Sequence, residues 1–329
     1  LFYAAISQSG SVFMPWVLPP EQPLLKAKLQ ARAFHCSTND PISIIKCLRR
    51  VDARDLVRNE VSMWQPVVET VSETNPEPFL TAAPLHLVRT GDFYKVPWLI
   101  GSTAQDGAFF GARKISSQME LAQFNYNLNA EGPKEFFLDL SVNRSLIPEI
   151  WDKIKQFYFS SMNNASAEEL IKLYTDRYVV HAVHKAVSLH STAGHEPIYR
   201  YNFAYRGLYS FVDLAEIGNK PENLGVVHMD DLIYLIPMPV FNIWPPGHPD
   251  RDVRELMITL WTNFATYGNP TPHGQWEPLG INNRSYLEIG HDESKPGLYG
   301  VKPIKLKIKQ GLYEERMKFW DSLPLKENL

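Results

Sequence analysis

The amino-acid sequence predicts an α/β fold in which helices flank a mostly parallel sheet. Val96 to Ile100 is an apolar run typical of a buried strand, and Pro197 to Tyr205 (PIYRYNFAY) has the alternation of a strand. Stretches with apolar residues at helical spacing accompany them, of which Arg251 to Tyr267 is the longest single example. In sheets of this kind, functional residues are found at the carboxyl ends of the strands.

The other elements are expected along the chain as follows. Helices are predicted over Glu21 to Phe34, Ile42 to Leu48, Ala53 to Val57, Pro84 to Thr90, Asn125 to Lys172, Tyr174 to His190 and Tyr313 to Leu323. Helical content over Leu1 to Ile6 leads into a strand at Ser7 to Gly10, Trp64 to Val71 reads as a strand interrupted by Pro66, and a late strand covers Ser285 to Ile289.

Composition and charge limit the domain organisation and the partners to be expected. The chain has 329 residues, is 44% hydrophobic and shows no low-complexity linker, so we expect one domain over residues 1–329. A net charge of -3 gives no reason to expect nucleic acid or an anionic membrane as partner. His181 and His184 have the spacing of a metal pair, but no further ligand at suitable spacing completes it, and no metal is expected.

Two motifs indicate acid-base chemistry. Gly225 to Tyr234 (GVVHMDDLIY) offers His228, after what reads as the end of a short strand, as a base that exchanges a proton near neutral pH. Lys95 to Phe110 (KVPWLIGSTAQDGAFF) offers Asp106 just past a strand, where it can orient that base. A single histidine is more often a surface or core residue. Acid before histidine is, however, the chain order of α/β-hydrolases, in which the nucleophile precedes both.

The nucleophile of such a hydrolase is missing from the sequence. Gly-x-Ser-x-Gly occurs nowhere in the 329 residues, and Ser7 to Ser11 lacks a glycine two residues before either central serine. The chain begins at Leu1 without Met, a basic segment or an apolar signal core. We therefore expect an N-terminally truncated chain whose nucleophile and oxyanion hole lie outside it.

Several motifs, in matching order, resemble the C-terminal part of a type-B carboxylesterase, the family of insect esterases and cholinesterases. They are LFYAAISQSGS (Leu1 to Ser11), the Cys36 and Cys47 pair, QPVVE (Gln65 to Glu69), VPWLIGSTAQDG, GVVHMDDLIY and WTNFATYGNPTP (Trp261 to Pro272). The resemblance covers almost the whole chain. It implies an α/β-hydrolase fold and ester hydrolysis through an acyl-serine intermediate, without metal or organic cofactor.

The resemblance also implies roles for single residues. His228 would be the general base and Asp106 the orienting acid, although the family more often has Glu there and only some insect members have Asp. Ser9 would help hold the acid and the imidazole by a hydrogen bond, the alternative being an ordinary turn serine. Met229 stands where many relatives have Gly, which crowds the entrance beside the base.

The adjacent carboxylates in the histidine loop have two possible interpretations. Asp230 and Asp231 resemble a catalytic pair, but neighbouring residues point apart, so we expect them to cap a helix that starts at Leu232.

The cysteines and sequons bear on compartment. From count alone, Cys36 and Cys47 are either two buried thiols or a disulfide, and the resemblance favours a disulfide that closes Ser37 to Lys46. Sequons at Asn143, Asn164 and Asn283 would accept glycans in a secreted chain. Together these features favour the secretory pathway.

The function expected from the sequence is hydrolysis of hydrophobic, xenobiotic or lipid-like carboxylic esters, with a small-molecule ester as partner. The 329 residues alone are expected to be inactive because they lack the nucleophile. The alternative is an esterase-like adhesion, binding or ligand-sequestering protein without a working triad. The Gln105-Asp106-Gly107 departure from the family's Asp-Glu-Gly gives that alternative weight.

Overall fold

The computed structural model describes residues 2–17, 23–59, 64–73, 75–214, 223–241, 244–274, 276–280 and 283–329. The chain forms two compact units. One comprises Leu1–Pro15 with Leu87–Leu329, and the other comprises Trp16–His86.

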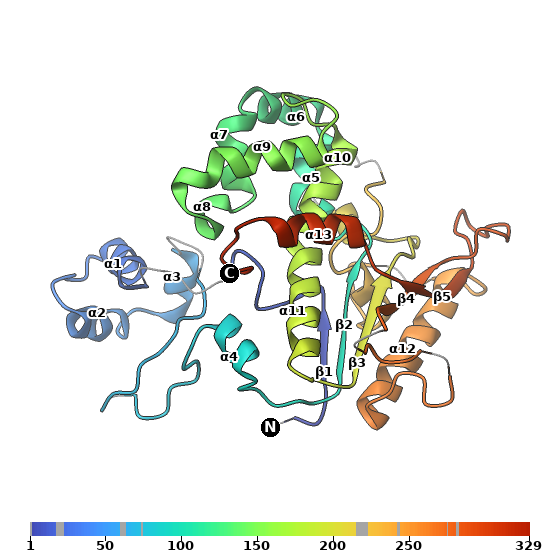
Figure 1. The fold of residues 1–329 in the computed structure, drawn as a ribbon, viewed down its shortest axis with the longest axis horizontal. Helices are drawn as coiled ribbons and strands as arrows, with labels where there is room; N and C mark the ends of the chain where they lie inside the picture. Colours follow the sequence, from blue (N-terminus) through green and yellow to red (C-terminus); the bar gives the residue numbers. More distant parts are fainter. Residues whose placement is uncertain are drawn as a thin grey trace. The chain divides into compact units, whose positions relative to one another are not determined.

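The larger unit is built on a five-stranded sheet whose spatial order equals the chain order (Figure 1). The strands are β1 (Ala5–Gln8), β2 (Trp98–Thr103), β3 (Ile198–Phe203), β4 (Ser285–His291) and β5 (Ile304–Gln310). The pairs β1–β2, β2–β3 and β3–β4 are parallel, and β5 runs antiparallel to β4. The prediction of a mostly parallel sheet is therefore confirmed.

Helices cover both faces of this sheet. The helical segments that follow β2 are α5 (Ala108–Ser116), α6 (Gln118–Tyr126), α7 (Leu128–Glu135), α8 (Leu138–Ser141), η1 (Arg144–Leu146), α9 (Ile147–Tyr158), α10 (Ala167–Thr175), η2 (Asp176–Val180), α11 (His181–Thr192), η3 (Phe211–Leu214), η4 (Asp230–Tyr234), α12 (Pro249–Tyr267) and α13 (Glu314–Ser322). Figure 1 shows α5 to α10 gathered beyond the carboxyl ends of β1 to β3.

Successive side chains of a strand point to opposite faces of the sheet. Each face therefore packs against a different helix. Buried apolar residues of α12, including Met257 and Phe264, share one core with Leu99 and Tyr201 on the first face. On the other face, Trp98 of β2 contacts the ring of His190 in α11, with ring centroids 4.8 Å apart. The sheet thus lies between α11 on one face and α12 on the other.

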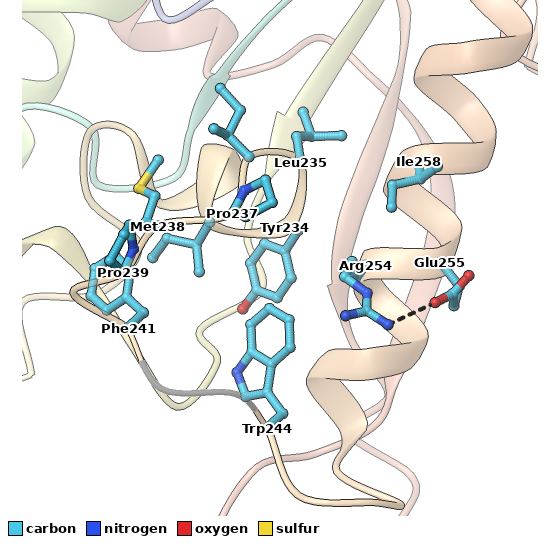
Figure 2. Close-up of a pocket in the computed structure, with 12 residues that line it drawn as sticks. Tyr234, Leu235, Pro237, Met238, Pro239, Phe241, Trp244, Arg254, Glu255 and Ile258 are labelled. Atoms are coloured by element: carbon cyan, nitrogen blue, oxygen red, sulfur yellow. Dashed lines mark hydrogen bonds and ion pairs between the residues drawn. The ribbon is translucent and has the colours of Figure 1, made fainter.

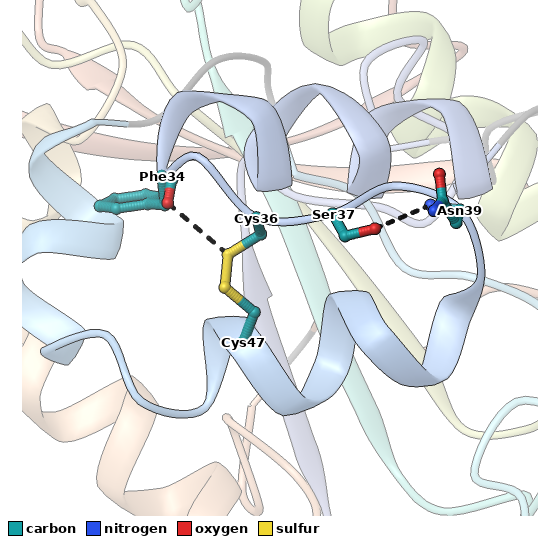
Figure 3. Close-up of a disulfide and its surroundings, with 5 residues drawn as sticks. All are labelled: Phe34, Cys36, Ser37, Asn39 and Cys47. Atoms are coloured by element: carbon teal, nitrogen blue, oxygen red, sulfur yellow. Dashed lines mark hydrogen bonds between the residues drawn. A yellow bond between two sulfur atoms is a disulfide. The ribbon is translucent and has the colours of Figure 1, made fainter.

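The described residues of the smaller unit include three short helices, and α4 (Pro84–Thr90) follows them in sequence and contains the boundary between the units. They are α1 (Pro23–Ala33), α2 (Pro41–Leu48) and α3 (Ala53–Arg58). A disulfide between Cys36 and Cys47 closes the connection from α1 through α2 (Figure 3), which confirms the pairing implied by the resemblance. Both sulfurs lie in a small core with Ala31 and Ile44.

Some expectations on secondary structure were wrong. Residues 64–71 form no strand; instead, the Glu69 side chain accepts from the backbone N–H groups of Phe79 and Leu80, and the Glu69 N–H donates to the carbonyl of Leu80 at 2.8 Å, without extending into a ladder. The start of the chain is not helical where it is described, because β1 already begins at Ala5. Glu21, the expected first residue of α1, lies outside the described residues.

No helix in the described part of the chain is both long enough and apolar enough to cross a membrane.

Candidate active site

The predicted acid and base meet beyond the carboxyl end of β2. Nδ1 of His228 lies 2.7 Å from Oδ1 of Asp106, although the two residues are 122 positions apart in sequence. The Asp106 side chain is 0% exposed, whereas that of His228 is 22% exposed. The pair therefore has a buried carboxylate and an imidazole that reaches the surface.

Two further donors satisfy the second oxygen of the Asp106 carboxylate. Oδ2 accepts from the hydroxyl of Ser9 at 2.5 Å and from the backbone N–H of Thr103 at 2.8 Å. Ser9 directly follows β1, and Thr103 is the last residue of β2. A carboxylate without water is costly unless its oxygens are paired, so these donors make the buried position of Asp106 tolerable.

Backbone contacts fix the two loops side by side. The N–H of Gln105 donates to the carbonyl of Val226 at 2.9 Å, and the N–H of Val226 donates to Oε1 of Gln105 at 2.9 Å. The N–H of His228 in turn donates to the carbonyl of Asp106 at 3.2 Å. The residues before His228 were expected to end a strand, but they form this loop contact instead, without a regular ladder.

Two glycines allow this close approach. Gly225 has a φ of +89°, and a Cβ there would lie 2.3 Å from Oε1 of Gln105. A Cβ on Gly107 would lie 2.1 Å from the backbone carbon of Tyr174. Both distances are too short for a Cβ. This explains why glycine directly follows Asp106 in the acid motif and begins the histidine motif.

Left-handed backbone occurs at two non-glycine residues beside the pair. Ser9 has a φ of +54° and Met229 a φ of +72°. Such conformations are unfavourable for residues with a Cβ and are frequent at functional sites. Ser9 donates to the acid and Met229 follows the base, so the site contains a strained residue beside each of them.

The expectation that the two aspartates of the histidine loop cap a helix was wrong. Asp230 accepts from the backbone N–H groups of Phe211 and Val227, at 2.8 and 2.9 Å, and from the hydroxyl of Ser210. Asp231 instead accepts from side chains of the sheet. Both are buried and are themselves the first residues of η4, so they bind donors of neighbouring elements.

Charges around His228 favour its protonated form. Burial alone lowers the pKa of an imidazole, but the hydrogen bond to Asp106 and the charges of Asp106, Asp231 and Asp230 outweigh it and raise the pKa of His228. The ring is thereby suited to hold a proton taken from another group.

An aromatic wall stands beside the imidazole. Phe109 and Phe110, in the first turn of α5, have ring centroids 6.2 and 5.2 Å from that of His228. The ring of Tyr178 in η2 lies 5.1 Å from that of Phe110. The exposed part of the base therefore borders an apolar surface.

A separate apolar cavity of about 710 Å³ lies between η4, the loop after it and α12 (Figure 2). Its lining includes Tyr234 and Trp244, whose rings stack with centroids 5.5 Å apart, and the Arg254–Glu255 ion pair at 2.9 Å. Asp106 and His228 are not among the described residues that line it. The cavity is therefore distinct from the acid-base pair.

The remaining candidate residues lie apart from the acid-base pair. Asn143 and Asn164 are exposed, whereas Asn283 is partly buried and its side-chain N–H donates to the carbonyl of Pro278 at 3.0 Å. His181 and His184 both contact Asp321, each at 3.2 Å. No group of three or more potential metal ligands lies among the residues that the structure describes.

Sequence reasoning did not identify Thr103, Gln8 and Tyr201 as parts of this site. Thr103 contributes only its backbone N–H, which carries no side-chain signal. Gln8 and Tyr201 reach Asp231 from β1 and β3, which come to lie on either side of β2 only in the folded chain. Only for Gln8 did the sequence contain a signal that could have placed it in the site, namely its position directly before Ser9 at the end of β1.

Comparisons with known proteins agree with this architecture. The model of the carboxylesterase family matches residues 1–320. Juvenile hormone esterase of Tribolium castaneum is 30% identical over 356 residues, covering 100% of this chain and 60% of that protein. Venom carboxylesterase-6 of Apis mellifera is 25% identical, covering 100% of this chain and 58% of that protein. The chain thus spans about three fifths of the length of these relatives.

A solved structure shares the fold. Juvenile hormone esterase from Manduca sexta, with OTFP covalently attached, superposes with a TM-score of 0.75 at 21% identity, covering 98% of this chain and 60% of that one. The fold is accordingly that of the α/β-hydrolases. With the family model matching nearly every residue, the chain belongs to the carboxylesterase family.

Proposed function

We propose that this chain carries the acid and the base of a serine carboxylic-ester hydrolase. The observation that carries the proposal is the 2.7 Å contact between Nδ1 of His228 and the buried carboxylate of Asp106. That contact leaves Nε2 as the nitrogen that exchanges protons with substrate-side groups. Because the sequence has no Gly-x-Ser-x-Gly, the nucleophilic serine and the oxyanion hole come from outside these 329 residues.

The proposed reaction has two halves. His228 takes the proton of the serine hydroxyl as the serine oxygen attacks the ester carbonyl carbon, and then gives that proton to the departing alkoxide. Water, deprotonated by His228, next attacks the acyl-serine, and the proton returns to the serine as the carboxylic acid leaves. Asp106 holds the imidazole in one tautomer and stabilises the imidazolium in both halves.

The substrate class follows from the surroundings of the base. Phe109 and Phe110 border His228 with apolar ring surface, which suits an ester with a hydrophobic acyl or alkyl group rather than a charged one. The Tribolium relative, which is named for its action on juvenile hormone, is consistent with a lipid-like ester. We therefore propose hydrophobic, xenobiotic or lipid-like esters.

The compartment proposed is the secretory pathway. The Cys36–Cys47 disulfide is typical of proteins folded in an oxidising environment, and the Apis relative is named as a venom protein. Asn143 and Asn164, both exposed, are the sequons we propose as glycosylated; Asn283 is the less accessible third.

The test is hydrolysis of p-nitrophenyl esters by the full-length gene product that contains this chain. We expect Asp106→Asn and His228→Ala to lower kcat/KM by a factor of about a thousand or more. His184→Ala is the matched control, because His184 is 27% exposed and also contacts an aspartate, yet belongs to another part of the unit. The 329 residues alone should show no turnover.

The opposite result would be equally clear. A folded full-length protein that turns over none of these esters, or one in which His228→Ala and His184→Ala behave alike, contradicts the proposal. The chain would then be better explained as an esterase-like binding protein.

A further inference from the structure

Asp231 is a buried carboxylate that the proposed reaction does not use. Its side chain is 1% exposed. Oδ2 accepts from Nε2 of Gln8 and from the hydroxyl of Tyr201, each at 2.8 Å. Oδ1 is buried and has no hydrogen-bond partner among the described residues. A carboxylate held in this way is costly, so a role that needs its charge has to be considered.

Adjacent residues of the chain connect Asp231 to the acid of the site. Gln8 donates to Asp231, and Ser9, the next residue, donates to Asp106. Oε1 of Gln8 accepts from the indole N–H of Trp261 at 3.2 Å, which turns the amide so that its N–H group faces Asp231. The two carboxylates are therefore tied to one short segment at the end of β1.

We propose that Asp231 is a positioning residue of the esterase site, a second carboxylate whose charge favours the protonated His228 formed during catalysis. The proposal rests on the proposed function. Asp231 acts through His228, three residues before it, and contacts neither the serine nor the ester.

The charges around the imidazole agree with this role. Three carboxyl groups act on His228, from the β2 loop (Asp106) and from η4 (Asp230 and Asp231), and each raises its pKa. Burial raises the pKa of Asp230 to about 7, so that group is only partly charged at neutral pH. Burial also raises the pKa of Asp231, while the donors on it oppose this and favour the charged form.

The direction of the effect follows from the charge. Without the negative charge at position 231, the pKa of His228 falls, so the neutral base persists to lower pH. The acid limb of the pH profile of kcat/KM then moves to lower pH. At the same time the imidazolium of the transition state is less stable, so kcat/KM at the optimum falls.

The experiment compares pH profiles of kcat/KM for the full-length protein with a p-nitrophenyl ester. Asp231→Asn should move the acid limb about one pH unit lower, which is the usual spread of histidine pKa values among proteins, and lower the plateau about tenfold. Tyr201→Phe, which removes one donor and retains the ring, should move the limb in the same direction by less. It serves as the second variant should Asp231→Asn fold poorly.

Asp250→Asn is the matched control. Asp250 is 0% exposed and accepts from the hydroxyl of Tyr205 at 3.0 Å, as Asp231 does from Tyr201, but it also accepts from the backbone N–H of Leu208 rather than from Gln8 at the end of β1. A limb that stays in place in folded Asp231→Asn, or moves equally in Asp250→Asn, overturns the proposal.

An NMR titration of His228 measures the effect of Asp231 on the pKa of His228 directly and does not require catalytic activity. A lower pKa in Asp231→Asn than in the wild type supports the role of Asp231 even if the wild type proves inert, in which case only the proposed function fails. Equal pKa values in an active enzyme overturn the role of Asp231 and leave the proposed function intact.

Discussion

Ser9→Ala removes one of the three donors to the Asp106 carboxylate. The Ser9 hydroxyl lies 2.5 Å from Oδ2 in a site where both side chains are almost fully buried, so water does not replace it. A hydrogen bond to a charged group contributes about 1.5–3 kcal/mol. If that loss appears fully in the transition state, kcat/KM falls by about 10- to 150-fold. The effect is smaller than for Asp106→Asn, because Thr103 and His228 still hold the carboxylate.

The assay measures kcat/KM and the urea-induced unfolding of the full-length protein for two variants of this residue. Ser9→Gly loses the same hydroxyl but relieves the φ of +54°, so it should match Ser9→Ala in activity and be about 1 kcal/mol more stable. Ser7→Ala, on the same strand, is the control, because the Ser7 hydroxyl accepts from Trp98 instead. Activity of Ser9→Ala within twofold of wild type would refute this reasoning.

Three further predictions concern stability, each followed by urea denaturation. Glu327→Ala removes the carboxylate that pairs with the Arg177 guanidinium where both side chains are 1% exposed, and leaves it only the neutral acceptors Phe136 and Ser141, so unfolding should become easier by about 3–5 kcal/mol; a loss below 1 kcal/mol would contradict this. Reduction of Cys36–Cys47, a loop of sequence separation 11, should cost about 3 kcal/mol in the chain-entropy model; no change on reduction would count against it. Burial raises the pKa of Asp176 to about 6, above that of an unfolded aspartate. Stability is therefore lost as pH rises from about 4 to 6, and Asp176→Asn should remove that part of the slope; an unchanged slope is the contrary result.

Local patterns were sufficient to predict β2, β3 and α12 of the larger unit, whereas β5 and α5 were not predicted. The apolar run before Asp106 is β2, the alternating run PIYRYNFAY contains β3, and the helix that ends before Gly268 is α12. In each case burial of a face is visible in the sequence period, because the element packs along its whole length. Residues 64–71 also have strand composition, but no neighbouring strand pairs with them, and pairing is not a local property.

The chemical pair of the site was predictable, whereas its support was not. Asp106 stands between the end of β2 and Gly107, and His228 stands three residues after Gly225 in a motif that resembles the histidine loop of the family. Their supporting donors have no such signature. Asp231 was expected to cap a helix because Asp is a common capping residue, yet in the folded chain it accepts from Gln8 and Tyr201, which lie 223 and 30 positions away in sequence.

The shorter acid is compatible with the geometry of the site because the loops, and not the side chains, set the separation. The backbone of His228 donates to the backbone of Asp106, so the two main chains are already in contact before either side chain is considered. From that starting point an aspartate reaches Nδ1 at 2.7 Å while its other oxygen still accepts from Ser9 and Thr103. The departure from the family's usual Glu is thus offset locally, and the loss of a methylene is not in itself an argument against a working acid.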